Sequence, residues 1–189
     1  DASFGTARNG TYVPATIPST VSFWRVVGLY LAEGHCAHDL DSGRLRLQWS
    51  FHPTDEDDLV EEVARFWNGL GVKVSIRRAP TSKIVSVSSR LLGTWWLDDL
   101  GLGRTCYEQR LPDAIWTEAE AHKRAVLAGL WLGDGSWSLV SGGPSIVLEY
   151  GTVSRELADG MLRLLGELGI VARLKVGRTA KSTVDTYWL

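Results

Sequence analysis

VVGLYLAEG at residues 26–34 and LAGLWLGDG at residues 127–135 are two copies of one nine-residue pattern. Both copies have glycine third, leucine fourth, an aromatic residue fifth, a small residue seventh, and an acid followed by glycine at the end. The acids are Glu33 and Asp134, which are 101 positions apart. Because such self-similarity is typical of a repeated structural unit, we expect the chain to consist of two related halves.

The segments around each copy also repeat in order. Helical spacing of apolar residues, strict alternation and turn residues predict a helix, a strand, a helix, two strands and a helix in the first half, at residues 20–34, 44–51, 55–71, 72–78, 83–89 and 89–101. The second half is predicted to follow the same order, at residues 117–134, 145–151, 154–169, 170–178 and 185–189. Residues 70–78 and 168–176 align at an offset of 98, which predicts three fewer residues in the hairpin of the second half.

Helix-capping residues support these boundaries. Ser19 or Thr20 is expected to cap the first helix and Thr54 the next one, because a hydroxyl at this position accepts a hydrogen bond from a free backbone N–H. Thr117 and Glu120 have the spacing of a capping box for the helix that ends at the second acid.

We therefore predict an α+β protein built from a pseudo-twofold pair of αββαββ repeats, with helices covering one face of each sheet. Its expected parts are a lead-in segment, a first repeat, a linker and a second repeat, at residues 1–19, 20–101, 102–117 and 118–189. A counterpart of the 89–101 helix would come after Leu189.

The composition is that of an ordinary globular domain, with 44% apolar and 22% charged residues. No apolar run is long enough to span a bilayer, the first residues lack a signal-peptide core, and two cysteines favour a reducing, cytoplasmic compartment. The net charge of −2 does not by itself indicate a nucleic-acid partner.

Small residues recur one helical turn apart in both motif helices, at Gly28, Ala32, Gly129 and Gly133. This spacing lets two helix backbones approach closely, although ordinary packing also explains a single pair. Packed about a pseudo-dyad, the helices would bring Glu33 and Asp134 together at their negative C-terminal ends. A shared divalent cation would relieve the repulsion, and oxygen ligands with room for water and phosphate suit Mg²⁺.

The two motifs, with the lead-in YVPATIPSTVSFWRVVGLYLAEG and the stretch QRLPDAIW, resemble the LAGLIDADG (dodecapeptide) homing endonucleases, in particular the endonuclease domains found inside inteins. The resemblance covers nearly the whole chain. It implies a monomer whose two antiparallel sheets form a saddle on double-stranded DNA, with Glu33 and Asp134 binding Mg²⁺, or Mn²⁺ in its place. Ala32 and Gly133, which precede the acids, are included as metal-binding positions.

Two features depart from the family pattern. The sixth motif position, often aspartate, is Leu31 in one copy and Leu132 in the other, and the usual basic helper lysine is replaced by Gln109. Gln109 could orient a water molecule and Arg110 could supply charge, so both are assigned to the catalytic site. A splicing nucleophile at residue 1 and a terminal His-Asn pair are not visible, so within an intein the chain would correspond to the endonuclease portion, fused to the splicing domain.

Polar and basic residues occupy alternate strand positions, as a DNA-facing sheet requires. The expected DNA-binding residues are Arg44, Arg46, Gln48, Lys73, Arg77, Arg78, Lys83, Arg173, Lys175, Arg178 and Lys181. For any one strand alone, a solvated sheet face is the alternative. Glu149 does not fit the basic pattern, because it would share a face with Ser145 and Val147.

Three other clusters favour ordinary structural roles. Acidic residues 55–58 complement a helix dipole. His35, Cys36 and His38 lack a fourth ligand at zinc-finger spacing and are expected in a loop over the active site. The nine tryptophans are expected mainly in the core.

Three functions remain open at this stage. The first is a site-specific, metal-dependent DNA endonuclease that promotes intein or intron mobility. The second is a degenerate relative that binds DNA, or structured RNA as a maturase does, without efficient cleavage. The third is a structural domain in which the acids only end two packed helices.

Overall fold

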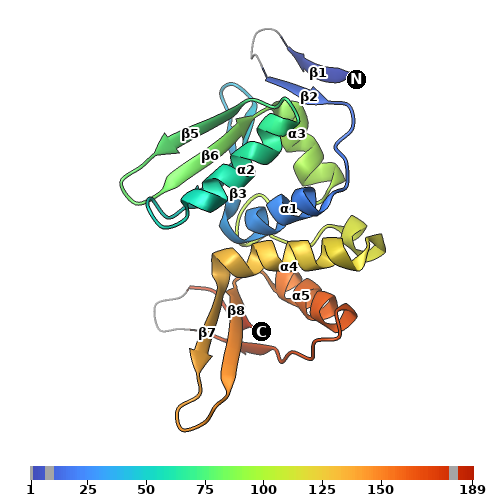
Figure 1. Cartoon of the computed structure of the whole chain (residues 1–189). Coiled ribbons are helices and arrows are strands. Elements are labelled where there is room, and N and C mark those ends of the chain that lie inside the picture. Colours follow the sequence, from blue (N-terminus) through green and yellow to red (C-terminus); the bar gives the residue numbers. More distant parts are fainter. Residues whose placement is uncertain (1, 7–10, 179–182) are drawn as a thin grey trace.

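The computed structural model describes residues 2–6, 11–178 and 183–189. Two four-stranded antiparallel sheets lie on opposite sides of a central helix pair, and each sheet has helices on one face (Figure 1). A short hairpin, β1 (Ser3–Thr6) and β2 (Thr11–Pro14), precedes the first repeat. Within the described ranges, no helix is long and apolar enough to cross a membrane.

The first repeat has the order αββαββα. Its elements are α1 (Val21–Glu33), β3 (Gly34–Asp39), β4 (Arg44–Phe51), α2 (Asp57–Gly69), β5 (Val74–Arg78), β6 (Lys83–Ser88), α3 (Arg90–Thr94) and η1, a π-helix (Trp95–Asp99). The strands pair in the order β3-β4-β6-β5. All three strand pairs are antiparallel. The strands at the two edges are β3, which follows α1, and β5, which follows α2.

The second repeat follows a 3₁₀ helix, η2 (Asp113–Thr117), in the linker. Its elements are α4 (Glu120–Asp134), β7 (Gly135–Leu139), β8 (Ile146–Thr152), α5 (Arg155–Glu167), β9 (Lys175–Gly177) and β10 (Thr186–Trp188). The order β7-β8-β10-β9 reproduces that of the first sheet. The predicted α+β class and the paired repeats are thus confirmed.

An aromatic cluster fills the core of the first repeat. Trp49, Trp67 and Trp96 are fully buried, and Tyr30 meets Trp96 edge to face with ring centroids 5.4 Å apart. Aromatic pairs in this geometry stabilise a core beyond their buried area. The tryptophans of this cluster are core residues, as predicted.

The second repeat leaves part of its sheet uncovered. In the first repeat, α3 and η1 bring Leu92 and Trp96 against the buried face. The corresponding face of the second sheet exposes 58% of Ile146 and 62% of Leu148. An apolar groove of about 940 Å³ runs between this face, α4 and the segment after α5.

The helix caps are only partly as predicted. The Thr20 hydroxyl accepts a hydrogen bond from the Phe23 N–H at 3.1 Å and caps α1. Thr54 instead bonds to its neighbour Asp55 at 2.7 Å, and α2 begins three residues later without a side-chain cap. Thr117 donates to the Ala114 carbonyl and ends η2, so the predicted capping box is wrong.

The missing three residues lie outside the predicted hairpin. Gly34 pairs with Trp49 and Gly135 pairs with Tyr150, so the first hairpins of the two sheets have equal length. Ser154 already caps α5, whereas the path from β4 to α2 is longer. The deletion therefore falls in the strand-to-helix connection.

Candidate active site

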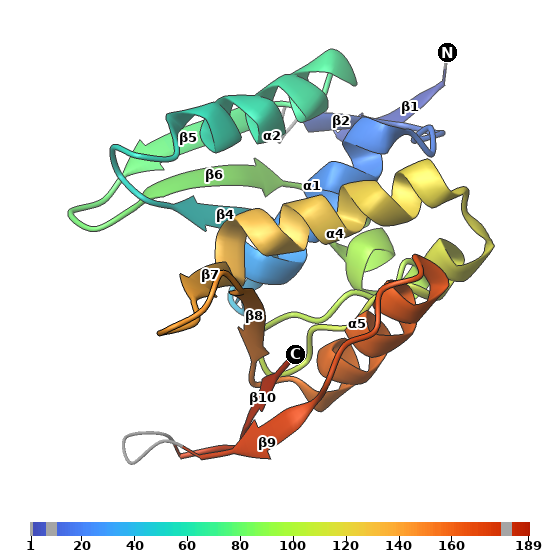
Figure 2. The ribbon, with the colours of Figure 1, turned by 60° about the horizontal axis from the view of Figure 1, so that its bottom comes forward.

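Glycines bring the two motif helices into backbone contact. A Cβ added at Gly28 would lie 2.3 Å from the Val126 carbonyl oxygen, and one at Gly129 would lie 2.5 Å from the Arg25 carbonyl oxygen. A side chain at either position would therefore force α1 and α4 apart. Figure 2 shows the two helices side by side, with β7 continuing directly from the end of α4.

This packing brings the two motif acids together where both helices end. A Cβ added at Gly133 would lie 2.5 Å from the Ala32 Cβ and 3.1 Å from Glu33 Oε1. Burial, followed by the negative charges of Asp134 and Glu56, raises the pKa of Glu33 from 4.5 to about 7. Burial likewise raises the pKa of Asp134 from 3.8 to about 6. The predicted juxtaposition of the two acids is therefore present.

A tyrosine lies beside the second acid. Tyr150 is fully buried on β8, opposite Gly135, and its ring lies 6.4 Å from that of Trp131. Its hydroxyl is near enough to lower the pKa of Asp134, yet it completes no hydrogen bond with the described residues. Burial raises the pKa of Tyr150, so the phenol stays protonated and can donate a hydrogen bond.

These residues fit a divalent cation. Mg²⁺ prefers oxygen donors and commonly binds one or two carboxylates while water and phosphate oxygens fill its other positions. Glu33 and Asp134 supply such carboxylates, and their raised pKa values reflect a pair of acids that a nearby positive charge would stabilise. Among the described residues, no group of three or more His, Cys, Asp or Glu lies where it could hold a metal ion.

Gln109 is buried behind this site. Only 1% of its surface is exposed, and its amide donates to the carbonyl oxygens of Gly34 at 3.2 Å and Tyr30 at 3.4 Å. The backbone carbonyl of Gln109 accepts a hydrogen bond from the Ser154 hydroxyl at 2.6 Å. The side chain thus joins the linker to the end of α1, next to Glu33, while its Oε1 atom has no partner in the described structure.

Arg110 points to a different neighbour. Its Nε donates to the Gly101 carbonyl at 2.5 Å, and its guanidinium lies 3.7 Å from a Glu156 carboxylate oxygen. The positive charge of Arg110 is therefore paired near the start of α5.

The first sheet carries polar side chains on the face opposite its helices, which we call the outer face. Leu45, Leu47, Trp49 and Phe51 point to the helices and are buried, so the alternate residues of β4 point outward. Arg44 and Arg46 are exposed on this face, and Gln48 donates to Ser86 of β6 at 3.1 Å. Arg77 belongs to the same face through its pairing with Ile84, and Lys73 is exposed just before β5.

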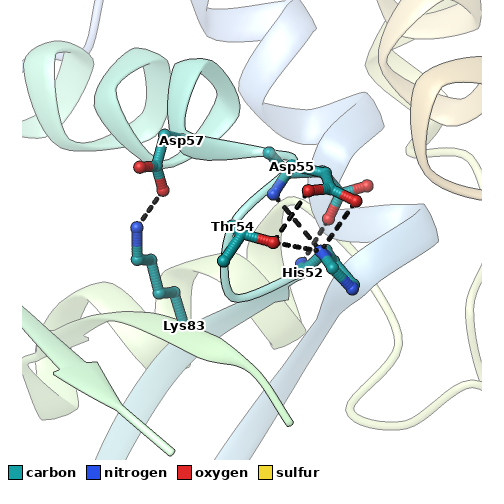
Figure 3. Close-up of polar contacts among 6 residues, drawn as sticks. His52, Thr54, Asp55, Asp57 and Lys83 are labelled. Carbon is teal, nitrogen blue, oxygen red and sulfur yellow. Dashed lines mark hydrogen bonds and ion pairs between the residues drawn. The ribbon is translucent and has the colours of Figure 1, made fainter.

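Lys83 is a correction to the predicted surface. It is only 5% exposed, lies on the helix-covered face opposite Phe51, and forms an ion pair with Asp57 of α2 (Figure 3). Because successive side chains of a strand point to opposite faces, Arg78, which follows Arg77 and pairs with Lys83, also lies on the helix side of the sheet, although it is exposed. Neither side chain belongs to the outer face.

The outer face of the second sheet is less basic. Arg173 and Lys175 are exposed, and the Lys175 ammonium lies 5.5 Å from the ring centroid of Trp188. Arg178 forms an ion pair with Asp185 at 2.9 Å. Glu149 is exposed on the same face, opposite Ser136, as its alternation with buried Tyr150 requires. Lys181 lies outside the described residues.

The predicted loop after the first motif is a strand. His35, Cys36 and His38 belong to β3, where Cys36 is buried and His35 pairs with Gln48 on the outer face. Tyr150 was not predicted as a site residue, because an aromatic residue in a strand indicates a core position. The sequence carries no signal for this role, because Trp49, which stands at the corresponding position of the first repeat, is a core residue.

Known proteins resemble both the sequence and the fold. Residues 121–188 match the model of the LAGLIDADG-like domain family. The uncharacterized protein MJ1054 of Methanocaldococcus jannaschii is 30% identical over 97% of this chain, which spans 21% of that protein. The replicative DNA helicase DnaB of Nostoc is 32% identical over 66% of this chain and 16% of its own length.

Solved structures show the same architecture. The homing endonuclease I-DmoI, in a complex with DNA and Ca, has a TM-score of 0.62 at 16% identity, covering 90% of this chain and 81% of its own. At this identity the likeness establishes the fold, and the family match adds the sequence relationship. The second repeat is a LAGLIDADG-like domain, and the chain as a whole has the fold of the LAGLIDADG homing endonucleases.

Proposed function

We propose that this chain is a site-specific, metal-dependent endonuclease that cuts both strands of a long DNA target. The observation that carries the proposal is the contact between α1 and α4, which holds Glu33 and Asp134 together at the junction of two sheets. The basic outer face of the first sheet supports DNA as the substrate, because arginine and glutamine side chains read base edges and phosphates. I-DmoI, of similar fold, binds DNA in crystals that contain Ca.

The acids define the chemistry of the site. Glu33 and Asp134 would hold Mg²⁺ or Mn²⁺, with the backbone at Ala32 and Gly133 close by. A bound divalent cation neutralises charge developing on a phosphodiester and lowers the pKa of a bound water. The Tyr150 hydroxyl lies near enough to Asp134 to be able to donate a hydrogen bond to its carboxylate, and Gln109 fixes the end of α1 that carries Glu33.

The relatives support a mobile element as the parent. The stretch similar to this chain makes up about a fifth of MJ1054 and a smaller share of the Nostoc helicase. We propose that the nuclease promotes the mobility of an intein or intron, and that its target is the host gene without the insertion.

Cleavage of supercoiled plasmid tests the proposal. Plasmid carrying the uninserted host gene should be linearised in Mg²⁺ or Mn²⁺ and only bound in Ca²⁺. Glu33→Gln or Asp134→Asn should abolish linearisation, because each removes a carboxylate that stabilises the reaction by several kcal/mol, while binding in Ca²⁺ persists. Glu61→Gln, on the exposed surface of α2, is the matched control and should cut normally. Linearisation by either acid variant would contradict the two-acid assignment.

A second function is favoured by Gln109. Its amide is committed to two backbone carbonyls, so it brings no positive charge to the acids. A protein that binds the same DNA without cutting it would show a Ca²⁺-like complex in Mg²⁺ and intact plasmid.

A further inference from the structure

The two sheets place different side chains at equivalent positions beside the acids. Gly34 pairs with Trp49 and Gly135 pairs with Tyr150, so the residues before these partners, Gln48 and Glu149, correspond to each other. Gln48 lies opposite His35 and Glu149 lies opposite Ser136. Each therefore lies opposite the residue that stands two positions after a motif acid.

Both side chains belong to the outer faces. Gln48 is half-buried, and its Nε2 donates to Ser86 at 3.1 Å, which fixes the amide and leaves its carbonyl oxygen and second N–H available. Glu149 is exposed, and it forms no ion pair within the described part of the chain. The Ser136 hydroxyl donates to the Glu149 backbone carbonyl at 3.3 Å, which leaves the carboxylate unused.

An unpaired carboxylate on a DNA-facing surface has a restricted choice of partners. Phosphate oxygens repel it, and most base-edge acceptors offer it no hydrogen. In the major groove, glutamate and aspartate accept hydrogen bonds from the N4 amino group of cytosine, whereas glutamine pairs with N6 and N7 of adenine. The exchange of glutamine for glutamate between equivalent positions therefore changes the base that each position can recognise.

We infer that Glu149 reads the amino group of a cytosine in the half-site under the second sheet, at the position that the pseudo-dyad relates to the base contacted by Gln48. The inference rests on the proposed function, since it requires DNA on the outer faces. It makes the target asymmetric close to its centre, where the two repeats otherwise resemble each other most.

Selection from a randomised duplex library tests this assignment. The whole protein is incubated with the library in Ca²⁺, bound duplexes are sequenced, and the consensus is compared among wild type, Glu149→Gln and Gln48→Glu. Glu149→Gln should shift one position of the second half-site from cytosine to adenine, with a change in preference of roughly 5- to 150-fold. Gln48→Glu should produce the reciprocal shift at the related position of the first half-site.

Two controls separate base reading from other effects. Glu61→Gln removes the same charge on the exposed surface of α2 and should leave the consensus unchanged. Single base-pair replacements in the selected target, measured by binding in Ca²⁺, should reproduce the preferences found by selection.

The outcomes are distinguishable from failure of the proposed function. A wild-type consensus that neither substitution alters overturns the base reading but leaves the endonuclease proposal standing. A rise in the Mg²⁺ concentration needed for cleavage by Glu149→Gln, with an unchanged consensus, also overturns it. Recovery of no consensus by the wild type overturns both proposals.

Discussion

Gln109 is the residue whose position departs most from its expected catalytic role. It lies beside Glu33, but it serves the protein backbone through Gly34 and Tyr30. A lysine there could donate to the same carbonyls, would remove the unpaired Oε1 atom, and would add a positive charge near the acids. A substitution at position 109 therefore changes both the hydrogen bonds that hold the end of α1 and the charge beside Glu33.

Gln109→Lys is expected to leave cleavage unchanged or to raise it, because a cation stabilises developing negative charge. Single-turnover cleavage in Mg²⁺ measures the effect. Gln109→Met, of similar size but without the amide, should lower the free energy of unfolding by about 1–3 kcal/mol through lost hydrogen bonds. A folded lysine variant that no longer cuts would mean that the amide itself orients a water molecule.

The two acids should make the metal-free protein sensitive to pH. Their folded-state pKa values are raised, so the folded protein holds these protons more tightly than the unfolded chain. The stability they contribute is full below about pH 4 and is lost as the pH rises through about 6 and 7. Because Asp134 is the more exposed of the two acids and is better screened by solvent, Glu33 should account for most of the effect.

Thermal unfolding at pH 5 and pH 8 measures this dependence. In EDTA, wild type should lose more Tm between the two values than Glu33→Gln, and Mg²⁺ should restore the loss at pH 8 by neutralising the pair. Equal pH profiles for the two proteins would contradict the raised pKa of Glu33.

Among the secondary-structure elements, the contact between α1 and α4 sets the geometry of the site. Gly28→Ala or Gly129→Ala would place a methyl group 2.3 or 2.5 Å from a backbone carbonyl oxygen of the other helix. We expect each to lower the free energy of unfolding by about 1–3 kcal/mol and to impair cleavage by separating the acids.

Gly166→Ala in α5 is the matched control, since a Cβ there meets nothing within 4 Å. It should be neutral or stabilise the helix by up to about 1 kcal/mol. Chemical denaturation of the three variants provides the comparison. If Gly28→Ala were as stable as Gly166→Ala, the close helix contact would be wrong.

The sequence predicts the elements that have strong periodicity and misses those that depend on partners. The helices α1 and α4, strand β4 and both acids follow from the repeated motif and its spacing. Strands β3 and β7 were not predicted individually, because GHCAHD lacks a clear alternation of apolar and polar residues and the alternation in GSWSL spans only five residues. They are strands because β4 and β8 supply hydrogen-bonding partners.

The same limit applies to the site. The sequence predicts Lys83 as a basic surface residue. Its ion pair with Asp57, in a helix 26 positions earlier in the chain, shows that it faces inward. Tyr150 reads as a core aromatic residue, and only the tertiary fold brings its hydroxyl to Asp134. Side-chain direction near turns and contacts between elements are decided by packing, which local sequence patterns do not contain.

Across the whole molecule, the two repeats should bind DNA unequally. The basic residues of β4 have no counterpart in the second repeat, where Ser145, just before β8, and Val147 stand at the offset of Arg44 and Arg46. Arg178 is already paired with Asp185, which leaves fewer free charges on the second sheet.

Arg44→Ala with Arg46→Ala should therefore weaken binding more than Arg173→Ala with Lys175→Ala. Each lost phosphate contact should flatten the salt dependence by roughly one unit of slope, and the first pair should relax sequence preference in one half-site only. Binding titrations at several salt concentrations measure both effects. Equal losses from the two double variants would show that the DNA-facing strands are assigned incorrectly.

The uncovered face of the second sheet has a consequence for how the molecule opens. β9 and β10 have three residues each, and within the described residues no helix covers the apolar face beside them as α3 and η1 cover the first sheet. Segments with few buried contacts open locally at low free energy, so amides of β9 and β10 should exchange with solvent faster than those of β4 and β6. In the proposed complex with DNA, binding of one half-site would include the free-energy cost of ordering β9 and β10, whereas the other half-site would meet a sheet that is already ordered.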